Sequence, residues 1–165
     1  MKKATSLLAL VASFNLGIAL PAVAAGAADA HEHGHSHQHE PAPAKLQLNK
    51  GKKWETDASF RKAMDIMRAE LAGKVHAIHK GTLPPESYVA IGNTIETQVA
   101  TIVSQCKLEP KTDEMAHIVI GDLLSAAIVL QGKGEGKPAE AAHRAVMVLN
   151  DYGKYFAHPG WKAIR

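Results

Sequence analysis

Five histidines at alternate positions near the start of the chain form its most distinctive chemical pattern. Residues 31–40 read HEHGHSHQHE, and the histidines are His31, His33, His35, His37 and His39. Neutral imidazole is the commonest metal ligand in proteins and suits zinc, copper and nickel. Several imidazoles on one flexible segment can surround a single ion, with Glu32 or Glu40 adding an oxygen. The tract predicts capture of copper or zinc, and the alternative is a hydrophilic spacer.

A second set of possible ligands is spread along the rest of the chain and comprises Met64, Cys106, His117 and His158. Thioether, thiolate and imidazole together suit copper, particularly Cu(I). At 1.5 Å per residue, Met64 and His117 lie about equally deep in their predicted helices, roughly 10 Å from one end. Another interpretation stays open for each residue. Met64 and Cys106 could be core residues, and Cys106 could also pair with a cysteine of a partner chain. His117 could be a hydrogen-bonded histidine on a buried helix, and His158 could cap the last helix or pack on Trp161.

Three more histidines are predicted to gather at the opposite end of the helices. His76 and His79 are three residues apart and share one helix face. With His143 as a third ligand they suit a surface zinc or copper site, although Lys74 and Lys80 would oppose a cation there. The alternative is an ordinary solvated face.

From Trp54 onward the apolar residues recur with a helical period. Four helices are predicted, at residues 57–80, 84–106, 111–130 and 138–156. The third is apolar nearly all round, so it should be the most buried. Four helices of about 20 residues joined by short turns predict an all-α fold, an antiparallel up-down-up-down four-helix bundle.

The start of the chain is typical of an export signal. Lys2 and Lys3 precede an apolar run at residues 7–20, and small residues follow near Ala24. We therefore expect a signal peptide at 1–25, a disordered His-rich arm and linker at 26–53, and the bundle at 54–165. The mature protein would be periplasmic, with no membrane span after cleavage.

Charge and motifs exclude several functions. Without Lys2 and Lys3 the chain has 17 basic against 16 acidic residues, which leaves no electrostatic basis for nucleic-acid binding. A single cysteine, Cys106, permits neither an internal disulfide nor a CxxC site. The sequence contains no GxSxG, HExxH or phosphate-loop motif, and we predict that the protein is not an enzyme.

The body resembles two groups of exported bundles. Glu135-Gly136-Lys137 and the Ala-rich stretch after it are similar to the cytochrome b562 and cytochrome c-prime group. Gly51 to Asp57 (GKKWETD), Cys106-Lys107-Leu108 and His158-Pro159-Gly160-Trp161 resemble small exported proteobacterial proteins sometimes labelled DnrO. Both resemblances imply a periplasmic bundle. The DnrO label implies no established activity.

A b562-type haem is a minor alternative on these residues. Such a site takes a Met from the first helix, where Met64 lies, and a His near the end of the fourth helix. The matching place falls near Phe156, and His158 comes two residues later, about 200° around the helix. A c-type haem needs CxxCH, which one cysteine cannot supply.

Two hypotheses of different class follow from the sequence. The first is a periplasmic protein that binds or buffers copper or zinc through its histidine arm. The second is a structural or partner-binding bundle without metal, which would dock a periplasmic protein at an exposed end around Trp54 and Trp161.

Overall fold

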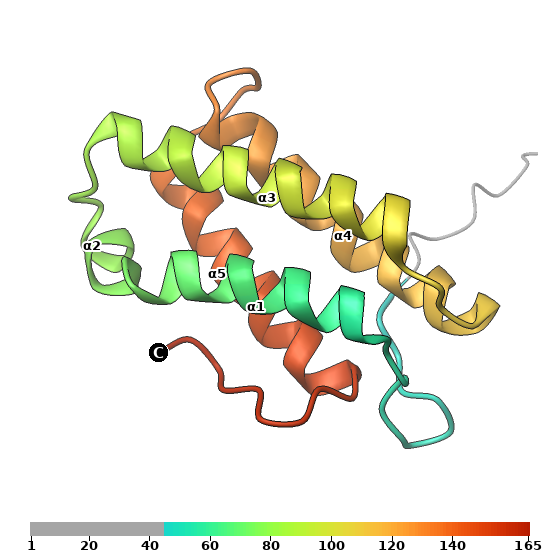
Figure 1. The fold of residues 1–165 in the computed structure, drawn as a ribbon. Coiled ribbons are helices and arrows are strands. Elements are labelled where there is room, and N and C mark those ends of the chain that lie inside the picture. Colours follow the sequence, from blue (N-terminus) through green and yellow to red (C-terminus); the bar gives the residue numbers. More distant parts are fainter. Residues whose placement is uncertain (1–44) are drawn as a thin grey trace, which may run out of the picture. The chain divides into compact units, whose positions relative to one another are not determined.

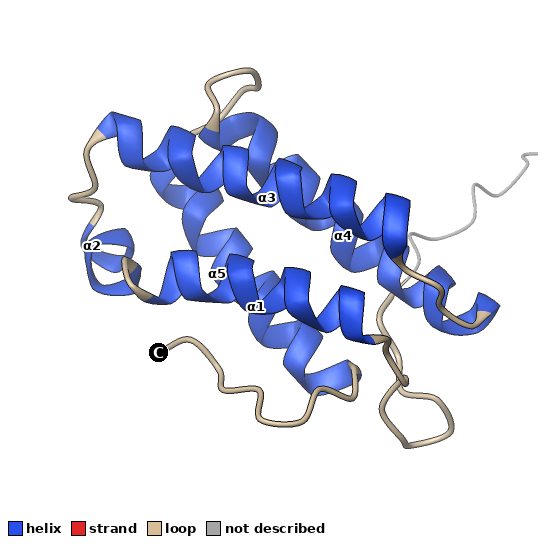
Figure 2. Ribbon diagram, viewed as in Figure 1, coloured by secondary structure: helices blue, strands red, loops and turns tan. Residues whose placement is uncertain are grey.

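The computed structural model describes residues 45–165, and these residues are helical with short connections (Figures 1 and 2). The helices are α1 (Ala58–Ala72), α2 (Val75–Lys80), α3 (Pro85–Gln105), α4 (Pro110–Leu130) and α5 (Pro138–Tyr155). The part of the chain that the structure describes contains no strand, only two isolated bridges. The expected signal peptide and the histidine tract lie outside the described residues.

The helices begin where the local chemistry favours a start. Asp57 caps α1, because its carboxylate accepts a hydrogen bond from the Phe60 N–H at 2.7 Å. Helices α3, α4 and α5 each have a proline, Pro85, Pro110 and Pro138, at the first turn, where its missing N–H leaves nothing unpaired. These starts lie within one residue of the predicted ones.

The predicted single helix at 57–80 is wrong, because the chain breaks at Gly73 and Lys74. Gly73 ends α1, since glycine lowers helix stability by about 0.5–1 kcal/mol relative to alanine. The Lys74 N–H then bonds to the Leu71 carbonyl at 3.0 Å, a tighter turn than an α-helix makes. Because Leu71 and Ile78 are both buried across the break, the apolar period continued through it and hid it.

The core lies where the helices face one another. Helix α1 packs against α3, α3 against α4 and α4 against α5, while α5 also contacts α1 and α2. The predicted inward residues of α3 and α5 are buried: Tyr88, Ile91, Ile95, Val99, Ile102, Ala142, Ala145, Val146, Leu149 and Tyr152. Helix α4 is not buried all round, since Ile128 is 47% exposed.

Segments before α1 and after α5 pair with each other. The Trp54 N–H donates to the Tyr155 carbonyl at 2.8 Å, and the Ala157 N–H donates to the Trp54 carbonyl at 2.7 Å. The Thr56 hydroxyl donates to the Ala157 carbonyl at 2.7 Å. The chain is therefore joined at its two flanks as well as through its helices.

Residues 45–53, which the sequence assigned to the linker, also contact the body. The Trp54 indole N–H donates to the Gln47 carbonyl at 2.6 Å. Asn49 and Lys52 exchange backbone hydrogen bonds in a turn, and Leu46 packs against the core. Residues 46–52 thus belong to the packing of the helical body.

The segment after α5 runs back along the helices (Figure 1). The side-chain amide of Asn150 makes two hydrogen bonds to this segment. Its oxygen accepts from the Ile164 N–H at 2.8 Å, and its nitrogen donates to the Ile164 carbonyl at 3.1 Å. Ile164 is buried, and the Arg68 guanidinium donates to the Lys162 carbonyl. This C-terminal segment, residues 157–165, is an integral part of the packing. Between residues 45 and 165, no helix combines the length and the apolar character that crossing a bilayer requires.

Candidate functional site

The side chain of His158 is nearly buried against the end of α5. Its Nδ1 is 2.9 Å from the Tyr152 hydroxyl, and its Nε2 is 3.3 Å from the Asp65 carboxylate. Its side chain is only 6% exposed, and its ring packs on Trp161 with centroids 5.0 Å apart. The packing of His158 on Trp161, one of the alternatives from the sequence, is confirmed. Both ring nitrogens already have partners.

Tyr152 is the nearest polar partner of His158. Burial raises the pKa of its hydroxyl well above the ordinary value of 10. The hydroxyl and the His158 Nδ1 share one hydrogen bond, and the Nε2 on the other side of the ring lies next to the Asp65 carboxylate. Tyr152 also stacks on Phe156 with centroids 5.2 Å apart. The arrangement holds the C-terminal segment rather than presenting free ligand atoms.

Cys106 ends α3 beside the start of α1. The Asp57 carboxylate accepts the Lys107 N–H at 2.6 Å and also pairs with the Cys106 thiol. Burial, together with the nearby carboxylates of Asp57 and Asp113, raises the pKa of this thiol to about 11. The thiol is therefore protonated at neutral pH, whereas metal binding and nucleophilic attack both need the thiolate.

Asp57 itself ionises readily in spite of this setting. Partial burial opposes its charge, but hydrogen bonds from the Phe60 and Lys107 N–H groups and the Cys106 thiol outweigh the burial, and Arg61 adds attraction. The net effect lowers the pKa of Asp57. One carboxylate thus ties the start of α1 to the end of α3.

Met64 on α1 and His117 on α4 do not point toward a common site, although we predicted that they lie equally deep along their helices. Met64 is fully buried in the core, whereas the side chain of His117 is 70% exposed on α4. The neighbours of His117 in sequence, Met115 and Ala116, occupy the inward positions. The Nδ1 of His117 lies 2.8 Å from the backbone carbonyl of Asp113. His117 is hydrogen-bonded, as one alternative held, but it is not buried.

The three polar members of this candidate set contact different partners. Cys106 pairs with Asp57, His117 bonds to the Asp113 backbone carbonyl, and His158 lies against Tyr152 and Asp65. The Asp113 carboxylate lies near both Cys106 and His117. Over residues 45–165, the His, Cys, Asp and Glu side chains form no cluster of three or more that could hold a metal ion. The sequence did not predict the contacts of Asp57, Asp65 and Tyr152 with Cys106 and His158, because nothing in local spacing marks a contact between distant segments.

The opposite end brings two histidines together. His79 on α2 and His143 on α5 have ring centroids 5.6 Å apart, with the ring planes inclined by 55°. Both are exposed, and both line a surface cavity of about 480 Å³ with Glu140 and Arg144. His76 does not line this cavity. Two of the three histidines that the sequence assigned to this end are thus neighbours.

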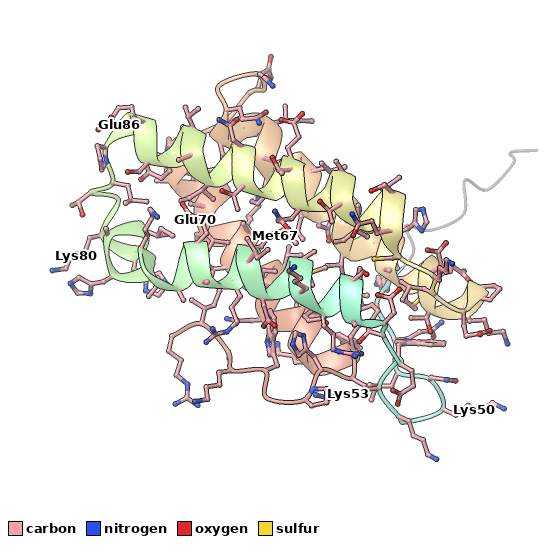
Figure 3. The ribbon with its side chains drawn as sticks, viewed as in Figure 1. Lys50, Lys53, Met67, Glu70, Lys80 and Glu86 are labelled. Carbon is pink, nitrogen blue, oxygen red and sulfur yellow. The ribbon has the colours of Figure 1, made fainter. Side chains whose placement is uncertain are left out.

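The charges around this histidine pair are mixed. Lys80 and Arg144 line the cavity and add positive charge, and Figure 3 labels Lys80 at the α2 end of the molecule. Glu140 adds a carboxylate and pairs with Lys137 at 3.1 Å, with both side chains largely exposed. Sequence spacing could have identified Glu140, because it lies three residues before His143 on the same helix.

The tryptophans proposed as a docking surface are not both available. Trp54 is only 7% exposed and belongs to the core, and Trp161 is partly buried against His158. Lys50 and Lys53, labelled in Figure 3, lie on the surface at that end. Neither tryptophan side chain is fully exposed, so the exposed surface at this end is formed by their neighbours.

The residues do not fit a b562-type haem. At the place in α5 where such a bundle needs a histidine, the chain has Phe156, which is fully buried and offers no ligand atom. His158 has Tyr152 and Asp65 as partners. We derive no chemistry through haem.

No protein-family model matches the chain, and neither a curated protein nor a solved structure matches it. The described residues form a helical body with an exposed pair of histidines, His79 and His143. A histidine tract precedes this body in the sequence.

Proposed function

We propose that the protein is an exported, periplasmic protein that binds or buffers a transition metal, copper or zinc, through its histidine tract. One observation carries the proposal: His31, His33, His35, His37 and His39 occupy alternate positions in ten residues. So many imidazoles in so short a segment can supply a full set of nitrogen ligands to one ion. The expected export signal at residues 1–25 supports the compartment.

We also propose that the body is an antiparallel up-down-up-down four-helix bundle, with α1 and α2 together as its first member. The order of contacts, α1 with α3, α3 with α4, α4 with α5 and α5 with α1, supports this topology. The bundle acts as a non-catalytic support for metal binding. The resemblance to exported bundles agrees with this proposal.

The surroundings of Met64, Cys106 and His158 make these residues poorer metal ligands than the histidine tract. Met64 is fully buried, the thiol of Cys106 is protonated at neutral pH, and His158 has partners at both nitrogens. Recruiting any of these groups would break contacts that hold the fold. The partner-binding alternative loses support because Trp54 lies in the core.

The decisive experiment is elemental analysis of protein purified from its own periplasm without an affinity tag. We expect copper or zinc to copurify. Calorimetric titration would then compare the natural protein with a variant in which the five tract histidines are replaced by asparagine. Loss of most of the bound metal supports the proposal. Unchanged affinity and stoichiometry in the variant would contradict it.

A further inference from the structure

We propose that His79 and His143 form a second metal site, on the helical body, that takes a divalent zinc or copper ion. This proposal depends on the proposed function in one respect only: both assume that the protein is exposed to zinc or copper ions. Its two ligands come from different helices, α2 and α5, and Glu140 lines the same cavity. The ion would therefore link two elements of the body.

The distance between the two rings suits a shared ion. Imidazole nitrogens bind zinc at about 2.0–2.1 Å, so two rings on one ion have centroids about 5–6 Å apart at angles near tetrahedral or somewhat wider. The observed separation of His79 and His143 is 5.6 Å. Both rings are exposed and can rotate about the bond to Cβ, so a nitrogen of each can turn toward the same point.

The backbone on both sides of the pair is held in place. Ile78, next to His79, is buried, and Ala142, next to His143, is fully buried. Helix α2 packs against α5 and ends at Gly81, whose φ of 62° is the left-handed conformation that glycine adopts without strain. Preformed positions reduce the ordering cost of binding.

The break at Gly73 makes the pair possible. Because α1 ends there, α2 can take its own direction and pack on α5. From the sequence we predicted one continuous helix at this point. That prediction put His79 and His143 at the same end of the body, but it could not show that their rings are in contact. The short helix α2 contributes one buried anchor, Ile78, and one exposed ligand, His79.

Glu140 lines the cavity but does not form a three-residue cluster with the two histidines within residues 45–165, so it would become a third ligand only after its side chain turns toward them. It lies one turn before His143, and its present partner, Lys137, is 81% exposed, so their ion pair is worth little. Water can complete the coordination, as it does at open zinc sites. The exposed Lys80 and Arg144 oppose a cation, but salt screens charges at the surface. We therefore expect moderate affinity that improves at higher ionic strength.

The test uses the full chain with the five tract histidines replaced by asparagine, titrated with Zn²⁺ alone and with Cu²⁺ alone. This variant should still bind one ion. Because losing even an outer-shell partner weakens metal binding about 10–100-fold, His79→Ala or His143→Ala should weaken it at least about tenfold. His76→Ala is the matched control, an exposed histidine on the same helix outside the cavity, and should change nothing.

Two further measurements keep the site testable if a variant is unstable. The electron paramagnetic resonance spectrum of bound Cu²⁺ should show nitrogen ligands. The same nitrogen signals should remain in the His76→Ala variant. Binding should weaken from about pH 7 to about pH 5, since protons compete for imidazole. Binding that strengthens on acidification would indicate an anion held by protonated histidines with Lys80 and Arg144, and would overturn the metal site.

The outcomes separate this site from the proposed function. If replacing the tract removes no metal but His79→Ala does, the body site stands and the tract proposal fails. If the tract variant binds no ion, the body site is wrong and the tract remains supported. If it binds an ion equally after His79→Ala and His143→Ala, the body site is wrong, and the comparison of the tract variant with the natural protein decides the tract proposal.

Discussion

The two ends of the helical body use their polar side chains in opposite ways. At the end where α1 starts and α5 finishes, His158 pairs with Asp65, and Asp57 pairs with Cys106 and Lys107, so distant segments are joined. At the α2 end, His79 and His143 face each other at the surface. We call the first the paired end and the second the open end.

The difference shows which groups remain available for a ligand. At the paired end, binding an ion would first break contacts such as the one between His158 and Tyr152, leaving a buried hydroxyl unsatisfied. At the open end, rotation of two exposed rings suffices. Residue type alone favoured the paired end, where thiol, thioether and imidazole coincide, but the surroundings favour the open end.

The largest expected effect is at His158. His158→Ala should lower the free energy of unfolding by about 2–3 kcal/mol, because Tyr152 loses its partner and Trp161 loses its neighbour. Urea denaturation followed by tryptophan fluorescence measures this. The matched substitution at the open end, His143→Ala, should change stability by less than about 0.5 kcal/mol in metal-free buffer. Equal losses would abolish the distinction between the ends.

The next effect concerns the contact of Trp161 with α5. A Cβ added at Gly153 would overlap the Trp161 indole, so Gly153→Ala should lower the free energy of unfolding by about 2 kcal/mol. Gly121 on α4 is the control, because a Cβ there meets nothing within 4 Å. Gly121→Ala should be neutral or stabilising by about 0.5–1 kcal/mol. Thermal denaturation of both variants compares them, and a tolerated Gly153→Ala would contradict the packing of Trp161.

Asp57 allows a pH test of the paired end. Asp57→Asn keeps a capping oxygen but removes the charge, and should lower stability by about 0.5–1 kcal/mol at neutral pH. Because folding lowers the pKa of Asp57, its contribution is present above the ordinary value of 3.8 and is lost as pH falls through the lowered value. The two proteins should therefore converge in stability as the pH falls below 3.8 and through the lowered pKa. A difference that persists there would require another cause.

The smallest effect on stability, and a clear kinetic one, is expected at Cys106. With a pKa of about 11, its thiol should react with a disulfide reagent at pH 8 about 100-fold more slowly than an ordinary thiol. Asp57→Asn should accelerate this reaction by removing a neighbouring charge. A rate equal to that of a free thiol would show that Cys106 is not held as described.

The sequence predicted most of the helical pattern, for physical reasons that can be named. Prolines at the starts of α3, α4 and α5 marked these helices, and the apolar period identified their buried faces. The break after Ala72 was missed because the period from Leu71 to Ile78 crosses it. Periodicity reports which side of a helix is buried, but not whether the backbone is continuous.

The candidate site was harder to predict. Helix α4 is apolar on most of its surface, so the sequence indicated the depth of His117 along the helix but not its direction, and its side chain is exposed. The contacts of His158 with Tyr152 and Asp65 depend on how the C-terminal segment returns along the body. We predicted that His79 and His143 lie at the same end of the body, because this required only the positions at which two helices end and begin.

The pairing of Trp54 with Tyr155 and Ala157 has a consequence for when the protein can fold. These partners are separated by about a hundred residues, and contacts between distant segments form late. The body cannot be completed until residues 157–164 have been synthesised, because Ile164 and Trp161 belong to its packing. If the protein is exported as we propose, this delay would help to keep the chain unfolded until it has passed through the membrane.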